Sequence, residues 1–167
     1  MVEEVSRARE SGDSVGGLVE LIVENAPAGL GDPGFDKLDA LLGGAMFSVG
    51  GVKGVEIGAG FAAAGRRGSE NNDQMGPEGF LSNHAGGILG GISSGQPIVM
   101  RLAIKPTPSI SREQSTQDLS ARSTVISIKG RHDPCLCPRI APVAEAMAAL
   151  VIADAWLVQK ALERSRQ

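Results

Sequence analysis

Aromatic residues are scarce in this 167-residue sequence: they make up 3% of it, and tyrosine is absent. The core must therefore be built mainly from aliphatic side chains and methionine. Cysteine is limited to Cys135 and Cys137, and two thiols at this spacing cannot fill a zinc site. We therefore predict no metal site, and we expect both thiols to be free, as in a reducing cytoplasm.

Long apolar runs are also missing. The longest, residues 147–158, is interrupted by Asp154 and is too short to cross a bilayer. The opening residues, MVEEVSRARE, do not have the pattern of a secretion signal. The net charge of −3 argues against general nucleic-acid binding. We therefore expect a cytoplasmic protein that binds neither membranes nor nucleic acids.

The charges that are present are unevenly distributed. Residues 1–40 contain nine acidic and three basic residues, whereas residues 101–139 contain seven basic and three acidic ones. An anionic ligand would bind in the basic part. The alternative is that these cations form an ordinary solvated surface.

Four segments show the alternation of polar and apolar residues that is typical of half-buried strands. On the third of them, Arg101 and Lys105 fall on the face opposite the apolar residues. On the fourth, Lys129 and Arg131 share a face. The predicted strands are residues 15–27, 50–61, 98–106 and 123–131.

Two main helices are expected. The first would start with Asp32 as cap, and Phe35, Leu38, Leu42 and Met46 would form its buried face. The second would start at Pro142, end near Arg164 and bury the stripe Val143, Met147, Leu150, Val151, Leu157 and Val158. Residues 64–81 and 112–122 are expected to be polar loops, and residues 1–13 the end of a truncated helix. The pattern predicts an α+β fold, with antiparallel sheet packed on two main helices.

The segment KGRHDPCLC places several charged residues in front of the last helix. Its possible metal ligands are too tightly spaced to surround one ion, and a Cys–His nucleophile pair would not converge on an extended segment. Arg131 offers a planar fork of donors to a phosphate or carboxylate. Asp133 could orient an arginine or accept a proton. Alternatively, Asp133 is the salt-bridge partner or the cap of this corner.

Two further segments bear on ligand binding. In HAGGILGGISSGQP, glycines would let backbone N–H groups approach a ligand closely, although the segment matches neither a dinucleotide fingerprint nor a P-loop. The alternative is a pair of glycine turns, with His84 as a hydrogen-bonded structural residue. In KPTPSI, two prolines would stiffen an extended exit that presents Thr107 and Ser109 beside Lys105, unless it is an ordinary loop. The residues alone thus predict an anion-binding domain with a glycine-rich wall.

Five motifs occur together in this order: AGLGDPGFDKLDA, VKGVEIGAGF, SNHAGGILGGISSGQPI, IKPTPSI and KGRHDPC…PRIAPVAEAM. In this combination the sequence resembles the chorismate synthase family, from about Asp13 to about Leu157. It corresponds to the C-terminal half of chains roughly twice as long. The resemblance implies that residues 1–167 form one region of a β-α-β sandwich, in which helices lie between two antiparallel sheets. It also implies a homotetramer in the full-length protein.

The resemblance implies a flavoprotein lyase of the shikimate pathway, linked to reduced FMN and NADPH. Its reaction is the anti-1,4 elimination of phosphate from the phosphorylated carboxylate 5-enolpyruvylshikimate 3-phosphate, which gives chorismate. Asp133 matches the acid that assists proton transfer near flavin N5. The implied FMN contacts are Gly50, Gly51, Gly90, Lys105, Pro106, Thr107, Pro108, Ser109 and Arg131.

The sequence departs from the family in two respects. Many members have Asn-Ala at the positions of Gly50 and Gly51, so only backbone contacts can remain there. The family's two catalytic histidines and its arginine-rich region for the substrate phosphate lie in the N-terminal half, which has no counterpart in this sequence. We therefore expect no turnover by this chain alone. The alternative is a non-catalytic half-domain for anion binding or oligomerisation.

Overall fold

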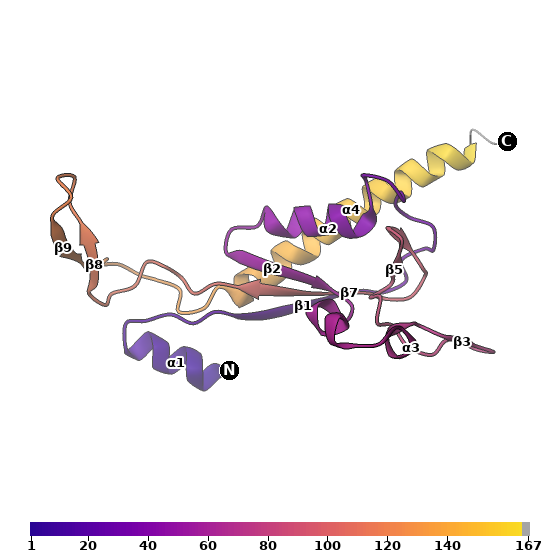
Figure 1. Ribbon diagram of the computed structural model, residues 1–167. Coiled ribbons are helices and arrows are strands. Elements are labelled where there is room, and N and C mark those ends of the chain that lie inside the picture. Colours follow the sequence, from indigo (N-terminus) through magenta and orange to yellow (C-terminus); the bar gives the residue numbers. More distant parts are fainter. Residues whose placement is uncertain (165–167) are drawn as a thin grey trace.

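The computed structural model describes residues 1–164, and its centre is a three-stranded antiparallel sheet (Figure 1). The strand order is β1-β7-β2, with β1 (Gly17–Val23), β7 (Ile98–Ile104) and β2 (Val52–Ile57). Leu21 pairs with Met100, and Val55 pairs with Leu102. The alternation seen in the sequence is thus a real sheet pattern, because every second residue of β7 is buried.

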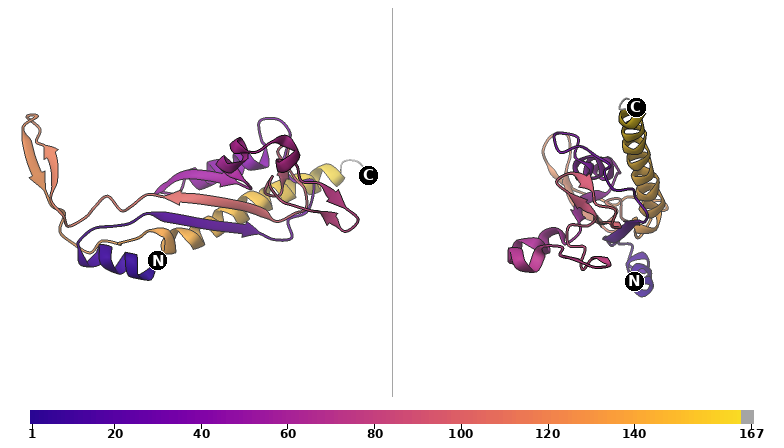
Figure 2. Two further views of the ribbon diagram at one scale, coloured as in Figure 1. Left: turned by 60° about the horizontal axis from the view of Figure 1, so that its bottom comes forward. Right: turned by 90° about the vertical axis from the view of Figure 1, so that its right-hand side faces the viewer.

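Two helices, α2 (Leu38–Phe47) and α4 (Cys137–Arg164), cover one face of this sheet (Figures 1 and 2). The fold prediction is confirmed: an α+β arrangement with antiparallel sheet packed on two main helices. The large side chains that are almost fully buried are aliphatic or methionine, as the scarcity of aromatic residues requires. They are Leu30, Leu38, Leu42, Met46, Ile98, Met100 and Leu102.

The start of α2 differs from the prediction. The helix begins at Leu38, whose N–H donates a 2.8 Å hydrogen bond to the carbonyl of Gly91. Asp32 instead accepts a hydrogen bond from the N–H of Gly34 at 2.7 Å and so holds a local turn. Phe35 lies in this turn and is fully exposed, so its place on the buried face was predicted wrongly.

The start and the buried face of α4 also differ. The Leu136 carbonyl accepts the N–H groups of Arg139 and Ile140 at 3.0 Å, so the helix starts before Pro142 and includes it. Its buried residues are Cys137, Ile140, Ala144 and Ala148. The alanines let the helix approach the sheet and α2 closely. The predicted stripe is therefore wrong for its large members outside the core, which are exposed: Val143, Leu150, Leu157 and Val158.

By length and composition, α4 could cross a membrane. Core helices of soluble proteins meet the same criteria, so length and composition are weak evidence for a membrane span. Its buried residues belong to the same apolar cluster as the residues of β1, β7 and α2. We therefore interpret α4 as a core helix that is covered on one side within this chain.

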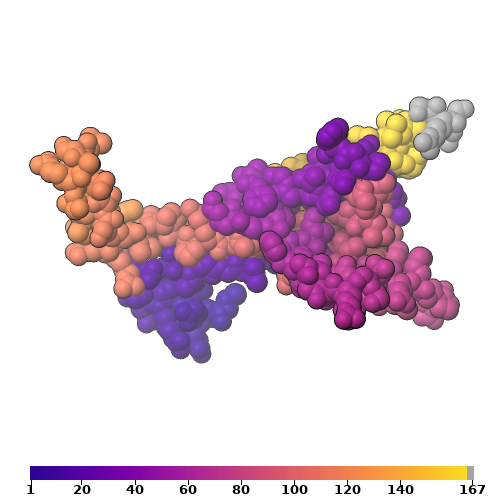
Figure 3. Space-filling view, in the orientation of Figure 1, coloured from indigo at the N-terminus to yellow at the C-terminus, as the bar shows by residue number. Residues whose placement is uncertain are grey.

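The remaining elements surround the central sheet. The predicted loop at 64–81 contains a short helix and a hairpin. The predicted loop at 112–122 and the predicted fourth strand together form a hairpin of exposed residues that projects away from the sheet (Figures 2 and 3). The fourth strand is therefore not part of the core. These elements are α1 (Val2–Glu10), η1 (Gly60–Gly65), α3 (Gly68–Asn71), β3 (Met75–Gly76), β4 (Gly79–Phe80), β5 (Ile88–Leu89), β6 (Ile92–Ser93), β8 (Gln114–Gln117) and β9 (Ser123–Ile126).

Candidate functional site

Most of the predicted contact residues meet at one end of the sheet, where β7 ends and β2 begins. The N–H of Lys105 donates a 2.9 Å hydrogen bond to the carbonyl of Gly51. The Thr107 hydroxyl donates to the carbonyl of Asp133 at 2.8 Å, and the Ser14 hydroxyl donates to the carbonyl of Thr107 at 2.7 Å. We call this region the corner; it consists of residues 14, 50–51, 105–109 and 131–133.

Asp133 holds two guanidinium groups at the corner. Its Oδ1 lies 3.3 Å from Arg131 Nη1, and its Oδ2 lies 3.2 Å from Arg139 Nε in the first turn of α4. The Asp133 side chain is 24% exposed and that of Arg131 is 78% exposed. Asp133 is thus the ion-pair partner that the sequence left open, and Arg131 still faces solvent. Sequence reasoning missed Arg139, although its place at the start of a helix after Asp133 was a usable signal.

Lys105 and Arg101, which the sequence placed on one face of a strand, differ in their ion-pair partners. Arg101 Nη2 lies 2.7 Å from Glu56 Oε2 on the neighbouring strand. Arg101 also precedes Lys105 by four residues of strand, about 13 Å. Lys105 has no carboxylate within ion-pair distance among residues 1–164. Alternation showed that both cations share a face, but it could not show which one is paired across the sheet.

Gly90 lies far from the corner within this chain. It forms the turn between β5 and β6, and the next residue, Gly91, accepts the hydrogen bond from the first residue of α2. Gly50 and Gly51 follow the other end of α2, a helix of ten residues and about 15 Å. The structure therefore does not bring Gly90 together with Lys105 and Arg131.

The backbone at Gly50 is open. A Cβ atom placed on Gly50 would meet nothing within 4 Å, so no packing inside this chain requires glycine there. Gly51 differs: its φ is +99°, and a Cβ atom there would lie 3.2 Å from Leu136 Cδ1. Gly50 thus leaves a thin surface beside Lys105.

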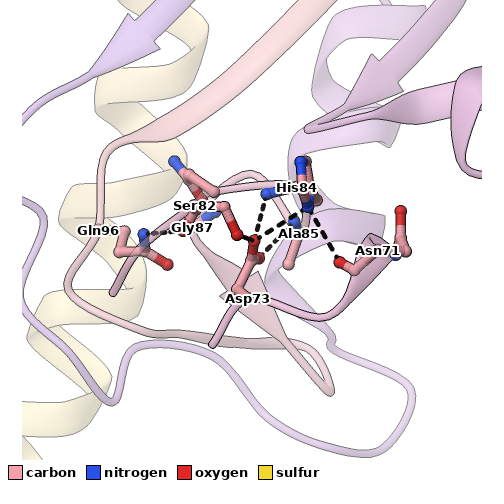
Figure 4. Close-up of polar contacts among 8 residues, drawn as sticks. Asn71, Asp73, Ser82, His84, Ala85, Gly87 and Gln96 are labelled. Atoms are coloured by element: carbon pink, nitrogen blue, oxygen red, sulfur yellow. Dashed lines mark hydrogen bonds and ion pairs between the residues drawn. The ribbon is translucent and has the colours of Figure 1, made fainter. Parts of the chain in front are cut away.

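A separate polar network fixes the glycine-rich segment (Figure 4). The buried carboxylate of Asp73 accepts hydrogen bonds from Ser82 Oγ at 2.6 Å and from the N–H groups of His84 and Ala85 at 2.7 and 2.8 Å. Burial raises the pKa of Asp73, but these hydrogen bonds outweigh it and hold the pKa below its usual value. His84 Nδ1 lies 3.2 Å from the carbonyl of Asn71. This arrangement favours the structural interpretation of His84.

The two cysteines are free. Cys137 is the first residue of α4, and its side chain is in contact with the Cys135 thiol. Burial, together with contact with the Cys135 thiol, raises the pKa of Cys137 to about 11. Cys137 is therefore a core side chain rather than a nucleophile. Among residues 1–164, no three His, Cys, Asp or Glu side chains converge as metal ligands.

The fold and the corner define an α+β domain that carries exposed or unpaired cations at one end of its antiparallel sheet. The family model described as chorismate synthase matches residues 1–157. The chain belongs to the chorismate synthase family.

Individual relatives agree with this assignment. Chorismate synthase of Syntrophus aciditrophicus is 57% identical over 162 residues, which cover 97% of this chain and 46% of the relative. That of Archaeoglobus fulgidus is 59% identical over 159 residues, covering 92% and 44%. A crystal structure of chorismate synthase matches with a TM-score of 0.75 and 35% identity, covering 95% of this chain and 42% of its own. The chain thus spans less than half the length of these relatives.

Proposed function

We propose that this chain is the FMN-binding part of a chorismate synthase. In the complete protein, the reaction would be the anti-1,4 elimination of phosphate from 5-enolpyruvylshikimate 3-phosphate, in the cytoplasm and by a homotetramer. The observation that carries the proposal is the corner itself. Residues 50–51, 105–109 and 131–133 are distant in sequence, yet they meet at one end of the sheet in a chain that belongs to this family.

The corner suits an anionic flavin. Lys105 has no carboxylate partner within the described chain, and Arg131 is exposed enough to reach a ligand. Both could offset the charges of a phosphorylated cofactor and of a substrate with phosphate and carboxylate groups. At Gly50, the open backbone would supply the contact to the flavin.

The residues of the corner would have different tasks. Reduced FMN, when bound, supplies the electron density that favours loss of phosphate. Asp133 would accept the proton that is removed from the substrate carbon, because its carboxylate is held in place by Arg131 and Arg139. The Thr107 hydroxyl is already bonded to the Asp133 carbonyl, so its task would be to position Asp133. Lys105 and Ser109 would then provide the side-chain contacts of this segment.

Gly90 needs a different explanation, because it lies at the other end of α2. We place its flavin contact in a neighbouring subunit of the homotetramer, where the β5–β6 turn of one chain would complete the corner of another. The position of this turn on the outside of the sheet supports this: a Cβ atom at Gly90 would meet nothing within 4 Å.

A flavin titration tests the proposal. The chain should bind FMN, binding should tighten when the substrate is present, and Arg131→Ala should abolish it. The alternative function, a non-catalytic anion-binding or oligomerisation module, predicts no such coupling between cofactor and substrate. An FMN affinity that changes neither when the substrate is added nor in the Arg131→Ala variant would contradict the proposal.

Turnover is tested by complementation. With dithionite-reduced FMN under anaerobic conditions, the chain alone should form no chorismate. Addition of the part of the Syntrophus aciditrophicus enzyme that this chain does not match should restore chorismate formation. Chorismate formation by the chain alone would contradict this division of tasks.

A further inference from the structure

A small cavity of about 200 Å³ lies on the outer side of the corner. It is enclosed by the end of α1, the segment that follows Ser109 and the segment in front of α4. We call it the outer pocket. Its lining residues are Arg9, Gly12, Asp13, Ile110, Ser111, Gly130, Arg131, His132 and Pro134.

The walls of the outer pocket are held by hydrogen bonds between distant segments. The N–H of Ser111 donates to the carbonyl of Gly12 at 3.0 Å, and that of Ile128 donates to the carbonyl of Ile110 at 3.3 Å. The His132 ring is fixed by Nε2, which lies 3.0 Å from the carbonyl of Ile128. The pocket is thus formed before any ligand binds, which lowers the cost of binding.

The charges around the outer pocket are unbalanced. Arg9 and Arg131 line it, and Arg9 has no carboxylate partner among residues 1–164. The lining acid, Asp13, is already bonded to Arg112 at 2.8 Å. Among the lining residues, two guanidinium groups thus stand against one carboxylate that already has a partner, and an anionic group would offset this excess of positive charge.

The size and the charge indicate the ligand. A volume of about 200 Å³ lies below the roughly 300–1,000 Å³ of pockets that enclose a whole drug-sized molecule. It suits one terminal group of a larger ligand. A phosphate monoester has a charge of about −1.5 to −2 at neutral pH and offers oxygens that match the guanidinium fork.

We propose that the outer pocket binds the phosphate group of a phosphate monoester between Arg9 of α1 and Arg131 of the corner. This makes α1 part of the binding site, although none of the motifs of the sequence includes Arg9. The inference rests on the proposed function only for the source of the phosphate, which is either FMN or the phosphorylated substrate.

Inorganic phosphate tests the pocket itself. In an NMR titration of the 167-residue chain, the amide signals of Gly12, Ser111 and Gly130 should shift with one common affinity. Arg9→Gln should weaken this binding about tenfold, since it removes a charge-assisted contact. Arg7→Gln is the matched control, because Arg7 lies on the same helix but is paired with Glu3 and Glu4 and does not line the pocket. Absence of phosphate binding, or equal loss in both variants, would overturn the inference.

Pairs of ligands that differ only in the phosphate group identify the source of the phosphate. If the phosphate belongs to the flavin, Arg9→Gln should weaken FMN binding and leave riboflavin binding unchanged. If it belongs to the substrate, the variant should weaken binding of shikimate 3-phosphate and not of shikimate. Two results together would overturn the inference: equal affinities for FMN and riboflavin, and no effect of Arg9→Gln on the binding of FMN or of shikimate 3-phosphate. These results would leave the proposed flavin function unaffected. Phosphate binding without any flavin binding would contradict the proposed function alone.

Discussion

The Thr107 hydroxyl donates a 2.8 Å hydrogen bond to the main-chain carbonyl of Asp133, 26 residues further along the chain. This bond joins the segment that leaves β7 to the segment that enters α4. Ser14 extends the connection, because its hydroxyl donates to the Thr107 carbonyl. The position of Asp133 therefore depends on a residue that was predicted to contact the flavin itself.

Replacement of Thr107 by valine tests this positioning role. Val keeps the shape of the side chain but leaves the Asp133 carbonyl without its donor, which should cost about 1 kcal/mol of unfolding free energy. FMN affinity should fall several-fold. Thr107→Ser, which keeps the hydroxyl, should restore both quantities. Urea unfolding and FMN fluorescence titrations measure them, and a valine variant with unchanged affinity would contradict the role.

Arg101 of β7 and Lys105, which directly follows β7, should differ in their effect on flavin binding. Lys105→Gln should weaken FMN binding about tenfold, because Lys105 lies at the corner and has no carboxylate partner in the described chain. Arg101→Gln should change FMN affinity less than about twofold, because Arg101 is paired with Glu56. The affinities are compared by fluorescence titration at one ionic strength. Equal losses would show that the whole face, and not the corner, attracts the flavin.

Asp73 should make the stability of the glycine-rich segment depend on pH. Since its pKa is lowered in the folded state, its contribution is present above the unfolded value of about 3.9 and is lost as the pH falls further. Asp73→Asn should cost about 1–3 kcal/mol at pH 7, because the buried N–H groups of His84 and Ala85 lose their carboxylate acceptor. The difference from the wild type should shrink as the pH falls below this unfolded value.

Asp118→Asn serves as the control for this experiment. The pKa of Asp118 is also lowered, by hydrogen bonds from the N–H groups of Arg122 and Ser120, but this carboxylate lies in the exposed β8–β9 hairpin. Its replacement should leave global unfolding nearly unchanged at any pH. Unfolding free energies from urea titrations between pH 2 and 7 separate the two variants. A pH profile of Asp73→Asn parallel to that of the wild type would contradict the assignment.

Cys137 should be unreactive in the folded protein. Its pKa of about 11 leaves almost no thiolate at pH 8, and its side chain is buried against the core. Iodoacetamide at pH 8 should therefore label Cys137 only after the protein is unfolded in urea, as followed by mass spectrometry. Rapid labelling without urea would show that the start of α4 opens readily.

The sheet could be predicted from the sequence because its alternation is local. Each buried residue of β7 is separated from the next by one exposed or half-exposed residue, and this pattern depends on no other part of the chain. The pairing of Arg101 could not be predicted in the same way, because it depends on the register between β7 and β2. The fourth predicted strand is present in part as β9, but it pairs with β8 and not with the central sheet, and alternation does not encode that choice of partner.

The corner could be predicted from the motifs, but not its internal bonds. The motifs named Lys105, Thr107, Arg131 and Asp133, and the fold brings them to one end of the sheet. The contact between the Thr107 hydroxyl and a main-chain carbonyl depends on how two loops meet, which no spacing in the sequence encodes. The separation of Gly90 from the corner likewise follows from the length of α2, not from the motif that contains it.

The outer side of α4 gives the last prediction. Leu150 and Leu157 are 66% and 60% exposed, whereas Ala144 and Ala148 are buried. Large apolar side chains that are exposed on a long helix are typical of a surface that contacts another part of a protein, and this chain spans less than half the length of its relatives. We expect the rest of the complete protein to cover Leu150 and Leu157.

Replacement of both leucines by glutamine should reduce self-association of the isolated chain, because it interrupts an exposed apolar surface. Its melting temperature should change little, since neither side chain belongs to the core. Ala148→Leu is the opposite case: it should cost about 1–3 kcal/mol, because the added volume has no space between α4 and the sheet. Sedimentation and thermal unfolding measure these effects. If the double glutamine variant unfolded instead, the outer leucines would have to stabilise the chain itself, and the assignment of this surface to the rest of the protein would be wrong.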